Sequence, residues 1–217
     1  MKTVRILLAD DHKVVRQGTR ALLSTMPEWQ IVGEADNGRD AVSLTAELKP
    51  DIVILDISMP KLNGLDATRQ IKKNSPDTEV LIFTAQETEQ LVHDVFESGA
   101  RSYILKTDAA DHLIDALKAL SEHKHFFTSR ISEIVFARCI QGKKALEGTS
   151  EKSRITDRER EIVQLLAEGK SSKEIATVLG ISVRTVETHR AAIMKKLGLK
   201  SFSELIRYAV RNKIVEA

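Results

Sequence analysis

The sequence predicts an α/β fold with a doubly wound, five-stranded parallel sheet, followed by a small all-α domain of four helices. Short β-branched apolar runs alternate with amphipathic stretches as far as residue 121, and the strand signal disappears after about His123. The length of 217 residues exceeds one average domain and is short for three. We therefore expect an α/β domain at 1–122, a linker at 123–152 and a helical domain at 153–217.

The predicted strands are short apolar runs, and several are apolar on both faces, as a buried parallel sheet requires. They are VRILLA (4–9), QIVGEA (30–35), DIVILD (51–56), TEVLIFTA (78–85) and RSYIL (101–105). Two helical stripes are formed by Val14, Val15, Gly18, Leu22 and Leu23, and by Leu113, Ile114, Leu117 and Leu120. In such a fold the ligand site is expected beyond the carboxyl ends of the central strands.

In the rest of the chain the sequence shows helix-capping motifs and helix-ending glycines instead of strand patterns. The run ISEIVFARCI predicts a helix over 129–141, and QGKKALEGTSEKSR after it is typical of a linker. Three capping boxes predict helix starts at Thr156 with Glu159, Ser171 with Glu174, and Ser201 with Glu204. Helix ends are expected at Gly169, Gly180 and Gly198. The short link GIS after the second helix has the length expected of a helix-turn-helix.

Charge and composition exclude some classes of protein. Residues 1–125 hold 15 Lys and Arg against 20 Asp and Glu, whereas residues 126–217 hold 18 against 11. A basic small domain points to nucleic acid. The single cysteine, Cys139, cannot form an internal disulfide, which suits a reducing compartment. No apolar run approaches the roughly 20 residues of a membrane helix and no signal peptide is evident, so we expect a cytoplasmic protein without a membrane partner.

Three acids follow two strands that are central to the predicted sheet. Asp10 and Asp11 follow the first strand, and Asp56 ends the third. The ends of adjacent parallel strands lie side by side, so these carboxylates should crowd together, and Mg²⁺ is the usual remedy for their repulsion. Each acid alone has another role available as a helix cap, but three at one edge favour a metal site. We do not expect His12 to be a ligand, because Mg²⁺ prefers oxygen.

Two further strands end in groups that complement these acids. Thr84 closes the fourth strand and Lys106 follows the fifth, which adds a hydroxyl and a cation to the same edge. A phosphoryl group on Asp56 would be held there by metal, hydroxyl, ammonium and backbone amides. Because a carboxylate can accept phosphate as an acyl phosphate, Asp56 is the candidate nucleophile.

These residues together resemble the receiver domain of two-component response regulators over roughly residues 3–122. The resemblance rests on Asp10, Asp11, the D-x-x-M-P motif from Asp56 to Pro60, Gly64, Thr84, Tyr103 and Lys106. It implies a flavodoxin-like receiver in which a sensor histidine kinase phosphorylates Asp56. It also implies Mg²⁺ on Asp11, Asp56 and the Ser58 carbonyl, with Asp10 acting through water.

The resemblance further implies that Thr84 and Tyr103 shift when the phosphate arrives. For Tyr103 an ordinary packing role in the strand is an equal alternative. Many receivers carry Lys-Pro with a cis peptide after the fifth strand, whereas this chain has Lys106-Thr107, so the isomer of that bond is open. A receiver catalyses only its own phosphorylation and dephosphorylation, and we do not expect an enzyme in the usual sense.

The basic end of the chain predicts a surface for DNA. The helix expected at 182–197 has Arg184 and Thr185 in its first turn and no acid there, which leaves its amide dipoles available to a phosphate oxygen. Candidate phosphate contacts are Lys173, Arg184, Arg190, Lys195 and Lys196, each of which would raise the salt dependence of binding.

This segment resembles the LuxR-type helix-turn-helix over about residues 153–217. The matching motifs are T-x-R-E at Thr156, Arg158 and Glu159, K-E-I-A at 173–176, T-V-x-x-H at 185–189 and K-x-L from Lys195 to Leu197. The resemblance implies that helix 182–197 enters the major groove, with Glu187, Thr188 and Ala191 as candidate base readers, while His189 packs or meets phosphate. Many relatives carry Asn at Ser172 and Lys at Glu187, and these two departures leave the target sequence open.

Receiver and helix-turn-helix together make the chain resemble a NarL/FixJ-type response regulator over nearly its full length. We expect a transcription factor that is switched by phosphate on Asp56, binds double-stranded DNA and forms a homodimer when phosphorylated, with RNA polymerase as a further candidate partner. Two alternatives remain. A phosphatase of small phosphoesters often carries a second acid two residues after its nucleophile, where this chain has Ser58. The other is a constitutive DNA-binding protein whose receiver is only an interaction module.

Overall fold

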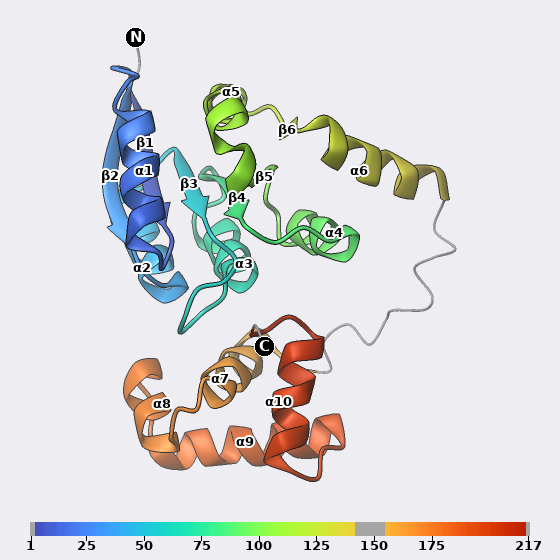
Figure 1. Cartoon of the computed structure of the whole chain (residues 1–217). Helices are drawn as coiled ribbons and strands as arrows, with labels where there is room; N and C mark the ends of the chain where they lie inside the picture. Colours follow the sequence, from blue (N-terminus) through green and yellow to red (C-terminus); the bar gives the residue numbers. More distant parts are fainter. Residues whose placement is uncertain (1–2, 142–154, 216–217) are drawn as a thin grey trace. The chain divides into compact units, whose positions relative to one another are not determined.

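The computed structural model describes residues 3–141 and 155–215. The chain divides into two compact units, Met1–Gly142 and Lys143–Ala217 (Figure 1). The first unit is a parallel sheet covered by helices, and the second contains only helices among its described residues. The predicted α/β class with a helical second part is confirmed. No helix in the described parts of the chain is long and apolar enough to cross a membrane.

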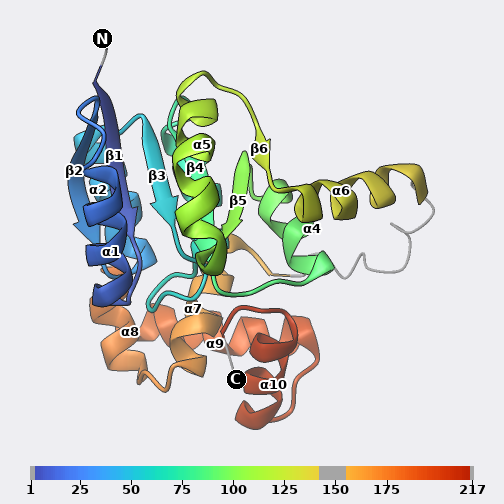
Figure 2. The ribbon, with the colours of Figure 1, turned by 45° about the horizontal axis from the view of Figure 1, so that its top comes forward.

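The sheet contains six strands in the order β2-β1-β3-β4-β5-β6, and all neighbours are parallel (Figure 2). Their bounds are β1 Val4–Ala9, β2 Trp29–Ala35, β3 Ile52–Leu55, β4 Glu79–Thr84, β5 Ser102–Leu105 and β6 Phe126–Phe127. Strands β3 and β4 are buried along their whole length, as expected of central strands with helices on both faces.

The prediction of five strands is wrong, because β6 adds a sixth. Phe126 pairs with Ser102 and Phe127 with Tyr103, so β6 extends the sheet beyond β5. Two residues are too few to show the alternation that identifies a strand in a sequence. The Phe127 ring also meets the Phe96 ring edge to face, with centroids 4.9 Å apart. The segment predicted as linker therefore contributes a strand to the first unit.

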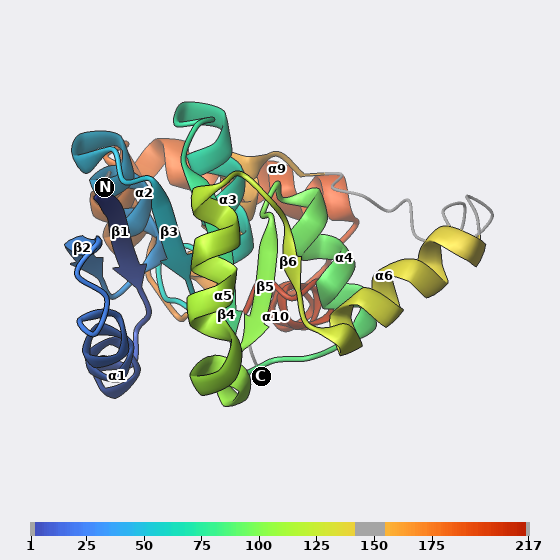
Figure 3. The same cartoon turned by 90° about the horizontal axis from the view of Figure 1, so that it is seen from above.

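The helices of the first unit cover both faces of the sheet (Figure 3). They are α1 Lys13–Leu23, α2 Gly38–Leu48, α3 Gly64–Asn74, α4 Glu89–Glu97, the short 3₁₀ helix η1 Lys106–Asp108, α5 Ala109–Ser121 and α6 Ser129–Gln141. Helices α1 and α5 enclose one apolar core against the sheet. Helices α2, α3, α4 and α6 share the other core, which Ile131 of α6 joins with 1% exposure.

The predicted stripe on α5 is confirmed for Leu113, Leu117 and Leu120, which are buried. The stripe on α1 is narrower than predicted: Val14 is 80% exposed and Gly18 is also exposed, Val15 and Leu22 are half-buried, and Leu23 is buried. Val14 lies in the first turn of α1. The remainder of the predicted linker, residues 142–152, lies outside the described residues.

The second unit contains α7 Asp157–Ala167, α8 Ser172–Leu179, α9 Val183–Leu197 and α10 Phe202–Arg211, as predicted. The capping boxes at Thr156 and Ser171 are complete. The third is half formed, because Ser201 accepts the Glu204 N–H while the Glu204 carboxylate accepts the Lys200 N–H instead. The predicted stops at Gly169, Gly180 and Gly198 all have positive φ, which glycine adopts without strain.

Candidate functional site

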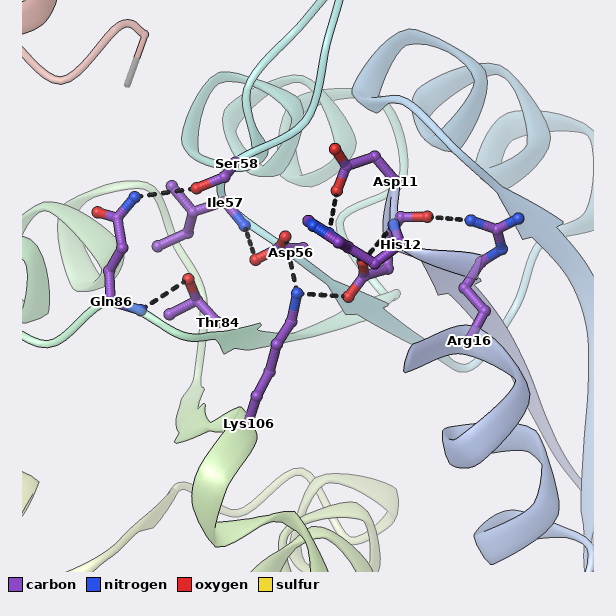
Figure 4. Close-up of polar contacts among 10 residues, drawn as sticks. Asp11, His12, Arg16, Asp56, Ile57, Ser58, Thr84, Gln86 and Lys106 are labelled. Carbon is purple, nitrogen blue, oxygen red and sulfur yellow. Dashed lines mark hydrogen bonds and ion pairs between the residues drawn. The ribbon is translucent and has the colours of Figure 1, made fainter. Parts of the chain in front are cut away.

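The strand ends of the first unit build a charged pocket at one edge of the sheet (Figure 4). Asp10 follows β1 and Asp56 follows β3, and these two strands pair in register up to Ala9 and Leu55. Thr84 is the last residue of β4, and Lys106 comes directly after β5. Since all these strands are parallel, their carboxyl ends meet, and the predicted pocket residues come together.

Lys106 lies between two buried carboxylates. Its Nζ atom is 2.7 Å from Asp10 Oδ2 and 2.9 Å from Asp56 Oδ2. Asp10 is 4% exposed and Asp56 is 2% exposed. One ligand atom from each of Asp10, Asp11, His12 and Asp56 lies within 4.8 Å of the others. Three carboxylates at this spacing form a donor set of the kind that binds Mg²⁺.

Burial and charge shift the pKa values of this pocket. Burial raises the pKa of Asp56, and Asp10 raises it further, although Lys106 and the Ile57 N–H lower it; the net direction is upward. Burial lowers the pKa of Lys106, but the carboxylates of Asp10 and Asp56 outweigh it, so that pKa is raised. The pocket therefore keeps a cation next to an aspartate whose ionised form is poorly solvated.

His12 lies at the exposed rim of the pocket. Its Nδ1 atom is 2.7 Å from Asp11 Oδ1 and 3.4 Å from Asp10 Oδ1, and its side chain is 64% exposed. Its backbone N–H donates to Asp10 Oδ1 at 2.8 Å. Arg16 also contacts the pocket, because its guanidinium donates to the Asp10 carbonyl. Arg16 is one turn into α1, and no motif in the sequence marked it.

Gln86 connects the residues that the sequence marked as a switch, and sequence reasoning missed it. Its side chain donates to Ser58 Oγ at 2.9 Å, and its backbone N–H donates to Thr84 Oγ1 at 3.3 Å. Its carbonyl accepts the hydroxyl of Tyr103, which is fully buried. Burial, with smaller effects of nearby Glu87 and Asp108, raises the pKa of Tyr103, so its hydroxyl stays a donor. Only the fold of the loop after β4 brings these groups together.

The backbone around the pocket explains two more features. A Cβ at Gly64 would lie 2.0 Å from the carbonyl oxygen of Asp56, so only glycine permits α3 to begin this close to the strand end. No peptide bond in the described residues is cis, so the Lys106–Thr107 bond is trans, and η1 begins directly at Lys106.

The second unit presents α9 as a helix with one buried and one exposed side. Val186 and Ile193 are buried in the core of the unit. The predicted DNA contacts that are exposed are Lys173, Arg184, Thr185, Glu187, Thr188, Ala191, Lys195 and Lys196, while His189 and Arg190 are half-buried. The Ser182 hydroxyl accepts the Thr185 N–H at 3.0 Å, and the first turn of α9 contains no acid.

Three of the predicted contacts have side-chain partners on other helices of the unit. Lys196 Nζ is 2.8 Å from Glu159 Oε2, and Glu159 is only 8% exposed. The Arg190 guanidinium lies over the Phe202 ring, 5.7 Å from its centroid. The carboxylate of Glu187 accepts a hydrogen bond from the Ser172 hydroxyl. The cations of this surface are therefore not equivalent.

Two family models match the two units of the chain. The response regulator receiver domain matches residues 6–118, and the luxR family of bacterial regulatory proteins matches residues 153–209. Together they define the class as a response regulator with a LuxR-type DNA-binding domain.

Relatives over the full length refine this class. The chain is 38% identical over 213 residues to the transcriptional regulatory protein LiaR of Bacillus subtilis, covering 98% of this chain and 99% of LiaR. It is 34% identical over 214 residues to the response regulator protein VraR of Staphylococcus aureus, covering 99% and 100%. A solved RcsB–DNA complex is similar with a TM-score of 0.57, 26% identity and coverage of 95% and 98%. The chain belongs to the NarL/LuxR family of two-component response regulators.

Proposed function

We propose that Asp56 accepts a phosphoryl group from a sensor histidine kinase, and that this phosphate controls sequence-specific DNA binding by the second unit. The observation that carries the proposal is a buried Asp56 carboxylate at a strand end, 2.9 Å from the Lys106 ammonium. An oxygen of Asp56 forms the new bond to phosphorus while the bond to the donor breaks. Lys106 then faces the added charge, and the Ile57 N–H, now 2.8 Å from Asp56 Oδ1, is a further donor.

The carboxylates of Asp11 and Asp56 fit a Mg²⁺ ion, and that of Asp10 lies close enough to contribute through water. The Ser58 carbonyl is the further ligand that the resemblance to receiver domains implies. Bound Mg²⁺ would supply positive charge that neutralises both the acids and the phosphoryl oxygens. Without such a charge, Lys106 is the cation that contacts both of the buried carboxylates of Asp10 and Asp56, and one positive charge does not balance two negative ones. His12 is not proposed as a ligand, because its nitrogen is a poor match for this ion.

The switch we propose runs through Gln86. A phosphoryl oxygen on Asp56 would attract the Thr84 hydroxyl, which now accepts the Gln86 N–H. Movement of Gln86 would weaken the contact of its carbonyl with Tyr103, so the phenol could leave its buried position. In the next residue, Glu87, the Oε1 atom lies 2.6 Å from Nε of Arg130. The same loop therefore also contacts α6, the last helix of the unit. This loop is the two-state element that the phosphate biases.

For the second unit we propose that α9 enters the major groove of double-stranded DNA. Its exposed Glu187, Thr188 and Ala191 face base edges, while Lys173, Arg184, Thr185, His189, Arg190 and Lys195 contact the backbone. Lys196 contributes less, because Glu159 compensates its charge. A solved structure of two RcsB dimers bound to DNA, with a TM-score of 0.58 and 26% identity, supports a homodimer as the binding form. RNA polymerase is the partner we propose for the DNA-bound dimer.

The decisive experiment compares wild type, Asp56→Asn and the exposed control Asp77→Asn. Mass by light scattering and affinity for DNA duplexes selected from a randomised pool are measured at fixed salt, with and without beryllofluoride and Mg²⁺. We expect wild type and Asp77→Asn to dimerise or gain DNA affinity, and Asp56→Asn to do neither.

Two results would favour the alternatives. Equal DNA affinity of all three proteins under both conditions would support a constitutive DNA-binding protein. Multiple-turnover hydrolysis of a small phosphoester by wild type, lost in Asp56→Asn, would support a phosphatase.

A further inference from the structure

Two polar residues on neighbouring helices of the second unit, Ser172 and Glu187, contact each other. Ser172 is the first residue of α8, and Glu187 lies in the second turn of α9, 15 residues further on. The Ser172 hydroxyl donates a hydrogen bond to the Glu187 carboxylate. A hydroxyl donor and a carboxylate acceptor thus form a matched pair across the helix-turn-helix.

This hydrogen bond restricts where the carboxylate points. A free glutamate side chain on a helix surface samples many rotamers, and holding it in one costs conformational entropy. The contact with Ser172 holds the carboxylate to a second helix before any ligand arrives, and a hydrogen bond to a charged acceptor is stronger than a neutral one. The adjacent Ser171 hydroxyl cannot replace it, because Ser171 donates to Glu174 at 2.7 Å.

The surroundings of Glu187 decide what the carboxylate can meet on DNA. Glu187 is the one acid in the sequence of α9, and Arg184 and Arg190 are each three residues away from it on this helix. A carboxylate is repelled by phosphates, so on a DNA surface its favourable partner is a hydrogen-bond donor on a base edge. In the major groove cytosine presents such a donor at N4, and Glu is a fitting acceptor for it.

We propose that Ser172 is a positioning residue that aims Glu187 at an exocyclic amine, so that the pair selects cytosine at one position of each half-site. The proposal rests on the function proposed above, in which α9 enters the major groove. Holding the carboxylate in place before binding lowers the entropy lost on contact, and so sharpens the preference for that base.

The test uses the full chain with beryllofluoride and Mg²⁺ and a duplex pool with a randomised core of about 20 bp, two helical turns. Wild type, Ser172→Ala, Ser172→Thr and Glu187→Gln are compared, with Ser203→Ala as a control at an exposed serine in the first turn of α10. Enriched sequences are counted base by base, and thermal unfolding of each protein is recorded.

We expect wild type to enrich a cytosine that Glu187→Gln no longer prefers, with a loss of discrimination of roughly 5- to 150-fold at that position. Ser172→Ala should relax the same position to a smaller extent, while Ser172→Thr, which keeps a hydroxyl, and Ser203→Ala should retain the preference. In a double variant with Ser172→Ala and Glu187→Gln, the loss should equal that of Glu187→Gln alone, because both residues act through one contact.

The outcomes separate this inference from the function on which it rests. If wild type enriches no sequence, specific DNA binding itself fails and the inference falls with it. If a sequence is enriched but Glu187→Gln keeps every base preference, Glu187 is not a reader. If Ser172→Ala matches Ser203→Ala, or merely unfolds earlier without changing base preference, Ser172 does not position Glu187.

Discussion

Each unit of the chain contains a lysine that contacts buried carboxylates, but the two lysines differ in exposure and in the number of carboxylates that they contact. Lys106 lies between Asp10 and Asp56 with 16% of its side chain exposed, whereas Lys196 meets Glu159 with 40% exposed. In the first unit one lysine faces two carboxylates, and the pKa of Asp56 is raised. In the second unit one lysine faces one carboxylate, and the pKa of Glu159 is lowered. The pocket around Lys106 therefore has uncompensated negative charge, while the Lys196–Glu159 ion pair is balanced in charge and stabilises the fold.

The largest effect is expected where backbone geometry supports the first pocket. In Gly64→Ala the new Cβ would lie 2.0 Å from the carbonyl oxygen of Asp56, so α3 must move. The free energy of unfolding should therefore fall by roughly 3 kcal/mol. Chemical denaturation measures this. Gly18→Ala is the matched control, because it has nothing within 4 Å of its Cβ on α1 and should stabilise by about 0.5–1 kcal/mol. Equal effects of the two changes would show that the approach at Gly64 is not tight.

A second prediction tests the charge of the first pocket. Lys106→Met leaves Asp10 and Asp56 buried without their cation and should lower the free energy of unfolding by roughly 3 kcal/mol. Because the variant has more uncompensated charge, millimolar Mg²⁺ should raise its melting temperature more than that of wild type. An Asp56→Asn/Lys106→Met double variant is the control and should show little response to Mg²⁺. A larger response in wild type than in Lys106→Met would contradict a pocket short of positive charge.

Much of the first pocket could be predicted from the sequence, because parallel topology alone brings the ends of β1, β3, β4 and β5 together. The strand β6 could not, since two phenylalanines carry no periodicity and are held by their pairing with β5. Gln86 could not either, because its three contacts depend on how the loop after β4 folds.

For the second unit the caps and glycines predicted all four helices, but pairwise contacts were out of reach. The bond between Ser172 and Glu187 depends on the crossing of α8 and α9, and that between Lys196 and Glu159 on the packing of α9 against α7. Sequence patterns fix where an element begins and which face it buries. They do not fix which surface groups of two elements meet.

The pH dependence of the two pairs should have opposite signs. Burial raises the folded pKa of Asp56 above its ordinary 3.8, so its contribution to stability is full below that value and is lost as the pH rises through the folded pKa. For Glu159, burial raises the pKa but the bonds from Lys196 and Thr156 lower it more, so its contribution is present above 4.5 and is lost as the pH falls through the folded pKa.

Urea unfolding of wild type, Asp56→Asn and Glu159→Gln between pH 3 and 8 measures both signs. The stability advantage of Asp56→Asn over wild type should grow as the pH rises through the folded pKa of Asp56, because the neutral amide does not ionise in the buried pocket. The deficit of Glu159→Gln should shrink as the pH falls below 4.5. If the difference in unfolding free energy from wild type changes with pH in the same direction for both variants, the two lysine–carboxylate sites do not differ in charge balance.

The smallest expected effect separates two adjacent lysines of α9. Lys195→Met should reduce the slope of log affinity against log salt by about 0.9, the contribution of one phosphate contact, with little change in stability. Lys196→Met should change that slope less, because Glu159 already compensates the charge, and should instead lower the stability of the second unit by about 1 kcal/mol. Salt titration of duplex binding and urea unfolding of both variants give the two numbers. If Lys196→Met reduces the slope as much as Lys195→Met, Lys196 leaves Glu159 when DNA binds. Lys196 would then resemble Lys106, since each lysine would turn from a carboxylate of the protein to a phosphate.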